Sequence, residues 1–412
     1  MTTAMRIDPH TGRVHLNPRD PHFYNNPYPY YHELRRQTPV FFWEDFGFWC
    51  FTTHEDVSAV LRDRRFGRQI LHIATREELG WPPEREDLKP FLDVDRYSML
   101  ELEPPAHTRL RSLVQKAFMA RQIERLRPRV ASLAHSLLDA LGEHGEADLL
   151  PTFATPIPVI VIAELLGVPT DMCDYLLSWS HAMVAMYELG RTPEQERKAV
   201  QAAQEFVAYI KDYVERRRRQ PKDDLITHLI QAEEEGEQLT EEELVSTCIL
   251  LLNAGHEATV HAIGNGVLAL LRHPDQLERL RREPTLIAPA VEEILRYDPP
   301  LHLFNRWVLE DVEVRGQRFR RGDRVAVLLG AANRDPAQFA NPDALDITRW
   351  PNPHVAFGGG IHYCVGAPLA RLELQVALPI LLERLPGLHL VEEPLYRNTY
   401  HFHGLQSLRV AW

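Results

Sequence analysis

The chain has 412 residues, of which 44% are hydrophobic and 25% are charged, and this ordinary globular composition excludes a disordered or fibrous chain. Acidic residues outnumber basic ones by 58 to 46, so the net charge is −12, which argues against nucleic acid or an anionic membrane as the main partner. The 4 cysteines form no CxxC pair and predict a reducing, cytoplasmic setting. No signal-peptide pattern opens the chain and its apolar stretches are short, so we expect no membrane anchor.

The first clear element is a hairpin in residues 39–53, where two aromatic runs flank a turn at 44–47. After it, apolar residues spaced three and four apart are typical of helices. These predicted helices cover residues 107–118, 123–141, 194–219 and 224–236.

A long buried helix is predicted for residues 240–273. Thr240 is placed as its N-cap, Glu243 completes a capping box, and His273 precedes the proline that ends it. About 33 residues at 1.5 Å each give a length of roughly 50 Å. Gly255 in mid-helix costs about 1 kcal/mol against alanine, so we expect its missing side chain to admit something close, such as a flat ligand.

Short strands and turns are predicted for residues 312–336, followed by a loop and then a helix over 366–385. No repeat or low-complexity linker divides the chain. We therefore expect one mostly helical domain over residues 1–412.

Cys364 lies in the segment FGGGIHYCVG, directly before that last helix. Glycines let the backbone approach a bulky object, and a helix N-terminus favours a thiolate. The pattern therefore predicts an anionic cysteine in a tight loop. Two alternatives stay open from the residues alone: a buried inert cysteine, and a zinc site with His354 and His362, although their spacing matches no recognised zinc motif.

Two further pairs share helical faces. Glu293 and Arg296 are three residues apart and can pair, although most such pairs are surface pairs of little energetic value. His107 and Arg111 are four apart after a proline pair and could clamp a carboxylate, the alternative being an exposed basic face.

Together, and in this order, these motifs resemble those of the cytochrome P450 family. FGGGIHYCVG is similar to the family's haem-binding loop at every fixed position, and EILR to its Glu-x-x-Arg pair. AGHEAT resembles its oxygen-activating segment, and PPAHTRLR the helix that reaches the haem propionates. The resemblance runs from about residue 20 to the end. It implies a mainly α fold with small β-sheets (α+β), in which a long central helix lies over haem b, iron protoporphyrin IX.

The resemblance also implies residue roles. Cys364 becomes the axial thiolate, a ligand that favours O–O cleavage. Glu293 and Arg296 become structural, with Arg349 as their third member. The residues implied to contact the haem are His107, Arg111, Ala254, Gly255, Arg306, Phe357, His362 and Gly366. Those implied to line the substrate pocket are Phe91, Leu92, Leu301, Leu303, Phe304 and Phe402, with polar contacts from His302, His403 and Gln406.

The oxygen-activating segment departs from the family pattern. The acid is retained as Glu257, but Ala258 stands where the family has an alcohol, and Thr259 comes one residue late, which is about 100° of helical rotation. We hypothesise that protons arrive through Glu257, water and a substrate group. The alternative is that Thr259 serves after a small helix distortion. His256 could join the path or be an ordinary core histidine.

The implied activity is a haem-thiolate monooxygenase that inserts one oxygen atom from O2 into a hydrophobic small molecule. Electrons would come from a separate ferredoxin and its NAD(P)H-dependent reductase. Arg109, Lys116 and Arg121 could form the docking patch, with ordinary surface charge as the alternative, and we expect a monomer. Two other functions stay open: a haem carrier or sensor, and different chemistry on the same fold, such as dehydration, C–C coupling or peroxygenation.

Overall fold

The computed structural model describes residues 5–142, 145–188, 190–234 and 239–412. These residues fold as two compact units that alternate along the chain. The sheet unit comprises residues 1–67, 127–155 and 258–412, and the helical unit comprises residues 68–126 and 156–257.

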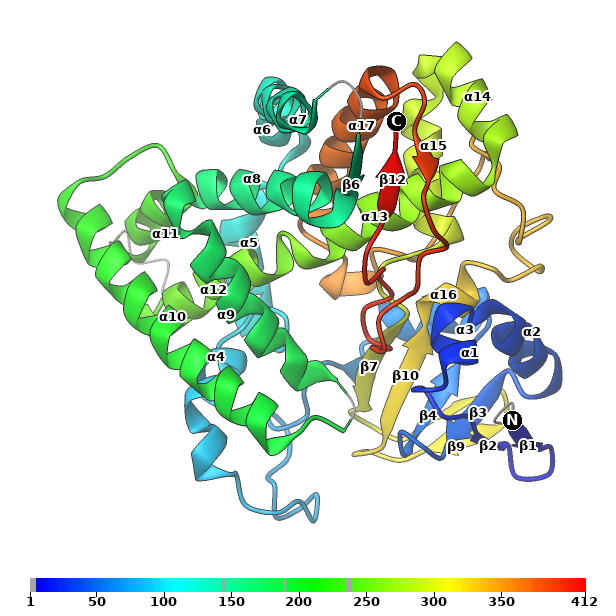
Figure 1. Cartoon of the computed structure of the whole chain (residues 1–412). Helices are drawn as coiled ribbons and strands as arrows, with labels where there is room; N and C mark the ends of the chain where they lie inside the picture. The colour runs from blue at the N-terminus through cyan, green and yellow to red at the C-terminus, as the bar shows by residue number, and fades with distance from the viewer. Residues whose placement is uncertain (1–4, 143–144, 189, 235–238) are drawn as a thin grey trace. The chain divides into compact units, whose positions relative to one another are not determined.

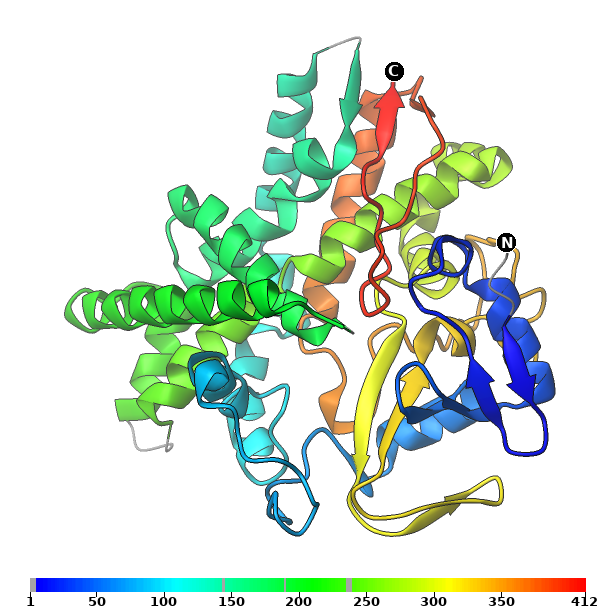
Figure 2. The same cartoon turned by 60° about the horizontal axis from the view of Figure 1, so that its bottom comes forward.

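The main sheet of the sheet unit is built around the predicted hairpin, which is confirmed as β3 (Val40–Trp43) and β4 (Phe48–Phe51). β10 (Arg324–Leu328) lies parallel to β4. β7 (Leu303–Val308) pairs antiparallel with β10, and Figure 2 shows these two strands side by side in yellow and gold. The strand order is β1-β2-β3-β4-β10-β7-β5. The other strands of this sheet are β1 (Arg6–Asp8), β2 (Arg13–His15) and β5 (Phe66–Gly67).

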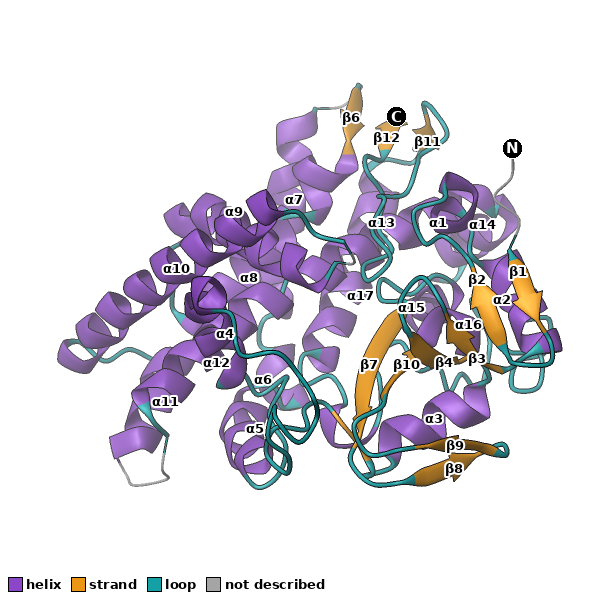
Figure 3. Cartoon of the chain, turned by 90° about the horizontal axis from the view of Figure 1, so that it is seen from below, coloured by secondary structure: helices purple, strands orange, loops and turns teal. Residues whose placement is uncertain are grey.

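Two smaller sheets, also drawn as orange arrows in Figure 3, belong to the same unit. One has the order β11 (His389–Leu390), β12 (Arg409–Ala411) and β6 (Glu146–Asp148). The other is the hairpin of β8 (Val312–Val314) and β9 (Gln317–Phe319), within the segment where the sequence predicted short strands.

Aromatic side chains form much of the sheet unit's core. Phe23, Tyr31, Phe41 and Trp43 are all fully buried, and Phe23 meets the ring of Trp43 edge-on at 5.8 Å. Rings of this size each bury a large apolar area, so they dominate the burial energy of a core. They pack on the face of the main sheet that carries Leu303 and Leu328.

The helices of the sheet unit include α17 (Ala367–Arg384), which follows Cys364 as predicted and packs beside α7 (Arg127–Leu141). The others are α1 (Pro21–Asn25), α2 (Tyr28–Gln37), α3 (His54–Arg62), α13 (Glu257–Arg272), α14 (Pro274–Arg282), α15 (Ile287–Tyr297) and α16 (Leu329–Ala332).

The helical unit is organised by α10 (Pro193–Arg219), which begins at a capping box between Thr192 and Gln195. It packs on α9 (Cys173–Val184), α4 (Lys89–Arg96) and α12 (Glu241–Ala254), as Figure 1 shows. The remaining helices are α5 (Ala106–Ala117), α6 (Ala120–Glu124), α8 (Pro156–Leu166) and α11 (Leu225–Glu234). The last residues of the helix predicted for 224–236 lie outside the described ones.

Short single-turn helices complete both units. They cover Glu86–Leu88, Leu150–Ala154, Thr170–Met172, Ala185–Tyr187, Pro284–Leu286 and Gly360–His362.

The long helix predicted for 240–273 has the expected capping box at Thr240 and ends before His273, but its continuity was predicted wrongly. α12 ends at Ala254 and α13 begins at Glu257. At the break, the His256 ring Nδ1 lies 2.8 Å from the Leu252 carbonyl oxygen and donates to it. This side-chain bond satisfies a carbonyl near the end of α12.

Gly255, at this break, is required by a close helix contact. A Cβ there would lie 2.5 Å from the Ile162 side chain of α8 and 2.6 Å from the Leu251 carbonyl oxygen. The expectation that its missing side chain admits a flat ligand was therefore wrong, because a neighbouring helix fills the space.

Candidate functional site

Cys364 stands in an ordered loop of the sheet unit, with its side chain exposed. Its backbone N–H donates to the Phe357 carbonyl at 3.0 Å, which closes the loop, and α17 begins at Ala367. A thiol so close to a helix N-terminus is in a setting that favours its anion.

The glycines before Cys364 are required by the local backbone. Gly358 and Gly360 have φ of 71° and 67°, a region that disfavours other residues. A Cβ on Gly360 would lie 2.2 Å from the Leu61 carbonyl of α3, and one on Gly358 would touch Phe304 at 3.4 Å. The bulky objects that these glycines approach are thus α3 and β7, which hold the loop in place.

The other three cysteines are unsuited to ligating iron, because burial raises their pKa values. The pKa of Cys173 is raised to about 11 and that of Cys248 to about 12. The pKa of the fully buried Cys50 is raised well above its ordinary value. Since a metal ligand must be a thiolate, the chemistry of the donors singles out Cys364.

A half-buried ion-pair system supports the cysteine loop from α15 and α17. Arg371 donates to both oxygens of Glu292 at 2.6 and 2.7 Å, and His354 Nε2 lies 3.0 Å from the same carboxylate. Burial alone would raise the pKa of Glu292, but these hydrogen bonds lower it to about 2. Arg371 also lies over the Phe357 ring, 4.5 Å from its centroid.

These contacts remove the zinc alternative for Cys364. His354 Nδ1 accepts from the Ala356 N–H at 3.2 Å, so both of its ring nitrogens are engaged. Within the described part of the chain, neither group of metal-capable side chains includes Cys364.

Glu293 and Arg296 are fully buried on α15 and form a bidentate pair, with both N–O distances at 2.8 Å. Arg349 donates to the same carboxylate at 3.1 and 3.2 Å, where the sequence predicted a third member. Arg296 also donates to the carbonyls of residues 333, 342 and 344. The cluster therefore ties α15 to the chain before the cysteine loop.

Three other residues predicted to contact the haem also lie in the sheet unit. Arg306 is buried on β7, while His362 and Phe357 are half-buried in the cysteine loop. An arginine, a histidine and a thiol in this unit are the kinds of group that a porphyrin with two carboxylates needs.

In the helical unit, His107 is buried and Arg111 is half-buried, four residues apart on α5. Arg109 on the same helix forms a bidentate ion pair with Glu243 of α12, at 2.6 and 3.0 Å. Its charge is thus neutralised within the unit, so the prediction that Arg109 belongs to an electropositive docking patch was wrong.

The residues around the helix break differ in exposure. Ala254 is exposed and Ala258 is half-buried, whereas Glu257 and Thr259 are buried. Thr259, one residue later than the alcohol expected from the family pattern, is therefore enclosed on α13, whereas the adjacent Ala258 is partly accessible.

The predicted pocket residues fall into two groups. Leu301 and Phe402 are half-buried and joined by a β-bridge, and Phe304 and Leu92 are also half-buried. Leu303 was placed wrongly in the pocket: it packs in the core with Tyr31 and Leu328, because it lies on the opposite side of β7 from Phe304. Phe91, also predicted for the pocket, lies within α4 and is buried against Tyr187.

His302 and His403 do not serve as polar pocket contacts either. They form a buried cluster with Asp298, in which His403 Nε2 lies 3.3 Å from the carboxylate and His302 Nδ1 lies 2.8 Å from the Tyr31 hydroxyl. Gln406 bonds to the Tyr396 carbonyl. No local sequence pattern indicates this cluster, because tyrosines from distant segments complete it.

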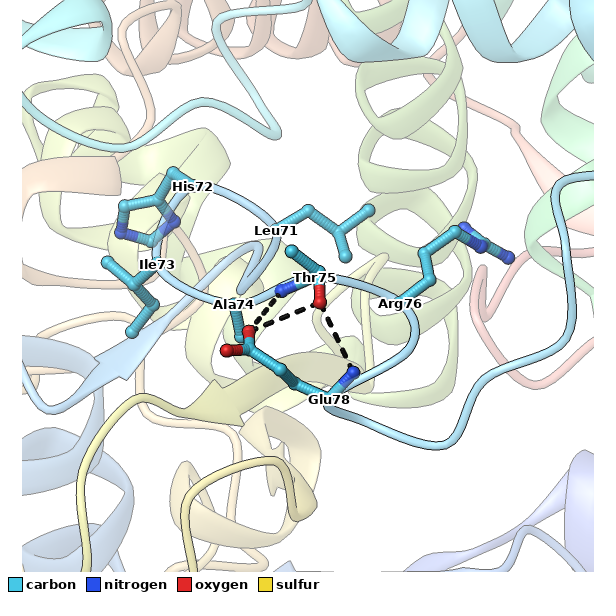
Figure 4. A pocket seen from close by; sticks show the side chains of 7 residues that line it. All are labelled: Leu71, His72, Ile73, Ala74, Thr75, Arg76 and Glu78. Carbon is cyan, nitrogen blue, oxygen red and sulfur yellow. Dashed lines mark hydrogen bonds between the residues drawn. The ribbon is translucent and has the colours of Figure 1, made fainter.

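A surface hollow of about 450 Å³ lies in the helical unit, lined by residues 71–76 and Glu78 (Figure 4). Thr75 and Glu78 cap each other there, with the Thr75 N–H donating to Glu78 at 2.7 Å. No predicted site residue lines this hollow, and it holds no group of catalytic side chains.

Comparison with known proteins decides the family. The sequence model of cytochrome P450 matches residues 81–386. The chain belongs to the cytochrome P450 family. Its fold is similar to that of P450BioI, whose structure was solved in complex with hexadec-9Z-enoic acid ligated acyl carrier protein. The two structures superpose with a TM-score of 0.89, and the sequences are 38% identical over 95% of this chain and 99% of that one.

Characterised relatives agree with this P450 assignment. The polyketide biosynthesis cytochrome P450 PksS of Bacillus subtilis is 40% identical over 97% of this chain and 99% of its own. The mycinamicin IV hydroxylase/epoxidase of Micromonospora griseorubida is 44% identical over 83% of each chain. The protein is therefore a P450 monooxygenase, and its cofactor is haem b with a cysteine thiolate ligand. Among the described residues, no helix combines the length and apolarity needed to cross a membrane.

Proposed function

We propose that this P450 inserts one oxygen atom from O2 into a hydrophobic small molecule, by hydroxylation or epoxidation, and that residues 1–412 act as one domain. The observation that carries this proposal is the contrast among the cysteines. Cys364 is exposed in a loop that α3 and β7 hold, whereas burial raises the pKa of each of the other three.

The residues present fit haem b. Cys364 would ligate the iron, Arg306 and His362 would hold propionates with His107 and Arg111, and Phe357, Ala254 and Gly366 would pack near the ring. When bound, this group activates dioxygen. Arginine suits a propionate because its planar fork donates two parallel hydrogen bonds.

Glu257 is the proposed proton-holding group of the site. The adjacent Ala258 has no hydroxyl to pass a proton, and the buried position of Thr259 supports the view that it does not take over. A hydroxyl or carbonyl of the substrate, with ordered water, would then complete the path from Glu257.

The paired variants Ala258→Thr and Thr259→Val test this path. Ala258→Thr should change the coupling, which is the fraction of the consumed electrons that is used to form product. The change should differ between substrates with and without a polar group near the reacting carbon. Thr259→Val should leave this coupling within about twofold of wild type, because an isosteric change at a non-participating buried position removes no transition-state contact. Uncoupling by Thr259→Val together with no effect of Ala258→Thr would overturn substrate-assisted delivery.

The substrate class follows from the half-buried apolar side chains Leu301, Phe304, Phe402 and Leu92. Apolar linings favour substrates that gain by leaving water. The relatives named for polyketide biosynthesis and mycinamicin, and the structure with a fatty acyl chain, support a long acyl or macrolide-like substrate. Incubation with such compounds, surrogate redox partners and isotope-labelled O2 should give a product that carries one labelled oxygen. Turnover without incorporated label would contradict the proposed reaction.

Electrons are proposed to come from a separate ferredoxin and its NAD(P)H-dependent reductase. Lys116 and Arg121 are exposed in the helical unit and remain candidates for the docking patch, whereas Arg109 is paired. Reversing both charges should slow reduction more at low than at high ionic strength, because salt screens exposed charges. A salt-independent effect would remove these two residues from the patch.

A further inference from the structure

Three side chains of the helical unit converge beside the helix break: His181 from α9, and His256 and Glu257 from the junction after α12. We call them the junction cluster. Glu257 Oε2 lies 3.3 Å from His181 Nε2 and 3.5 Å from His256 Nε2. One ligand atom of each residue lies within 4.8 Å of those of the other two.

The His256 ring is already oriented as a metal ligand requires. Its Nδ1 lies 2.8 Å from the Leu252 carbonyl oxygen, which can only accept, so Nδ1 carries the proton. In the neutral ring the Nε2 lone pair therefore points to the carboxylate side. Metal-bound histidines typically donate their other ring N–H to a carbonyl in this way, which fixes the tautomer.

The spacing of the donors suits a small tetrahedral ion. Zinc–nitrogen and zinc–oxygen bonds of about 2.0–2.2 Å place neighbouring ligands of a tetrahedron about 3.3–3.6 Å apart. Both measured distances to Glu257 fall in this range. Two histidines and one glutamate, with water as the fourth ligand, are an established zinc donor set.

The three side chains of the junction cluster differ in their exposure to solvent. His256 and Glu257 are 3% and 8% exposed, whereas His181 is 52% exposed. Two ligands are thus held rigidly and the third faces solvent, which leaves a side for a water ligand. Next to it, the Asn253 amide lies 3.7 Å from the Met183 sulfur and links α12 to α9.

We propose that the junction cluster binds Zn²⁺ through His181, His256 and Glu257, and that the bound ion inhibits the enzyme. The site follows from the geometry alone. The inhibition rests on the proposed function, because an ion held by Glu257 occupies the carboxylate that would supply protons.

Calorimetric titration of ZnCl2 into chelator-treated holoenzyme tests the site directly. We expect one ion per chain, and at least about tenfold weaker binding in His181→Asn and Glu257→Gln, since each loses a ligand. His228→Asn is the matched control, because His228 is 57% exposed and lies 3.4 Å from the Asp223 carboxylate without a second histidine. It should bind Zn²⁺ as wild type does.

Equal Zn²⁺ affinity in wild type and both ligand variants would overturn the site and reduce the junction cluster to an ion pair. Product formation with and without Zn²⁺ then separates the two proposals. Inhibition of wild type but not of His181→Asn supports both. Stoichiometric binding that leaves turnover unchanged keeps the site and contradicts the proton role of Glu257.

Discussion

Among the residues that the structure describes, two histidines and one carboxylate meet at two places in this P450, with different surroundings. In the junction cluster, one histidine faces solvent and a single carbonyl orients the other. In the second cluster, Asp298, His302 and His403 are all buried, and tyrosines form hydrogen bonds to them. Tyr396 donates to one oxygen of Asp298 at 2.6 Å and Tyr28 donates to the other. The Tyr31 hydroxyl bonds to His302.

Ring packing separates the two clusters further. His403 stacks on Tyr396 at 3.9 Å and lies 4.2 Å from the His302 ring, at 37°. In the buried cluster the His403 ring is thus covered by Tyr396, whereas the two junction rings lie 6.3 Å apart at 62°. The same residue types thus form a structural cluster where all of them are buried, and an ion site where one of them faces solvent. We call the cluster of Asp298, His302 and His403 the brace.

The brace holds the wall of the proposed pocket. The backbone N–H of His403 donates to the Pro300 carbonyl at 2.9 Å, and Leu301 forms a β-bridge with Phe402. Burial alone would raise the pKa of Asp298, but the charge and hydrogen bond of His403 lower it well below its ordinary value. Burial, followed by the charge on His403, lowers the pKa of His302, which stays neutral.

Asp298→Asn should have the largest effect. Removing the negative charge breaks the buried contact with His403 and weakens the hydrogen bonds from Tyr28 and Tyr396, and breaking a buried pair typically costs about 3–5 kcal/mol. We expect a melting temperature of the holoenzyme several degrees below wild type. His181→Asn breaks the contact with Glu257, in which the histidine is 52% exposed. It should change the free energy of unfolding by less than about 1 kcal/mol. Equal losses in both variants would erase the distinction between the clusters.

Tyr396→Phe should have an intermediate effect. It removes one hydrogen bond to a buried carboxylate, and hydrogen bonds to charged groups contribute about 1.5–3 kcal/mol. Tyr175→Phe, at a tyrosine 59% exposed, is the control and should melt with wild type. A melting temperature for Tyr396→Phe that matches this control would show that Asp298 does not depend on its tyrosines.

The pH dependence should give the smallest and most specific signal. The folded pKa of Asp298 is lowered, so its stabilisation is complete above the unfolded pKa of about 3.9 and is lost as pH falls through the folded value. The gap in melting temperature between wild type and Asp298→Asn should therefore be constant above about pH 5 and should narrow below about pH 4. A gap that widens on acidification would contradict the sign of this shift.

Much of the fold could be predicted because its signals are local. The capping box of Thr240 and Glu243 and the hairpin of β3 and β4 are encoded within a few residues. The break after Ala254 could not be predicted, because it depends on Ile162 of another helix and on the ring of His256. The spacing of apolar residues shows which face of a helix is buried, but it does not show which other segment packs against that face.

The candidate site divides in the same way. Cys364 and the pair of Glu293 and Arg296 lie in short motifs, so their types and spacing were informative. His181 is distant in sequence from Glu257, and nothing in its neighbourhood indicates the contact. Leu303 was misplaced because a difference of one residue in a strand moves a side chain from pocket to core.

A carbon monoxide difference spectrum of the reduced protein shows whether Cys364 is the thiolate ligand of the haem. Wild type and Cys173→Ser, a control at a half-buried cysteine whose pKa is raised to about 11, should both show the red-shifted band of thiolate-ligated haem. Cys364→Ser should lose that band. A Cys364→Ser protein that binds haem and keeps the thiolate band would contradict the account.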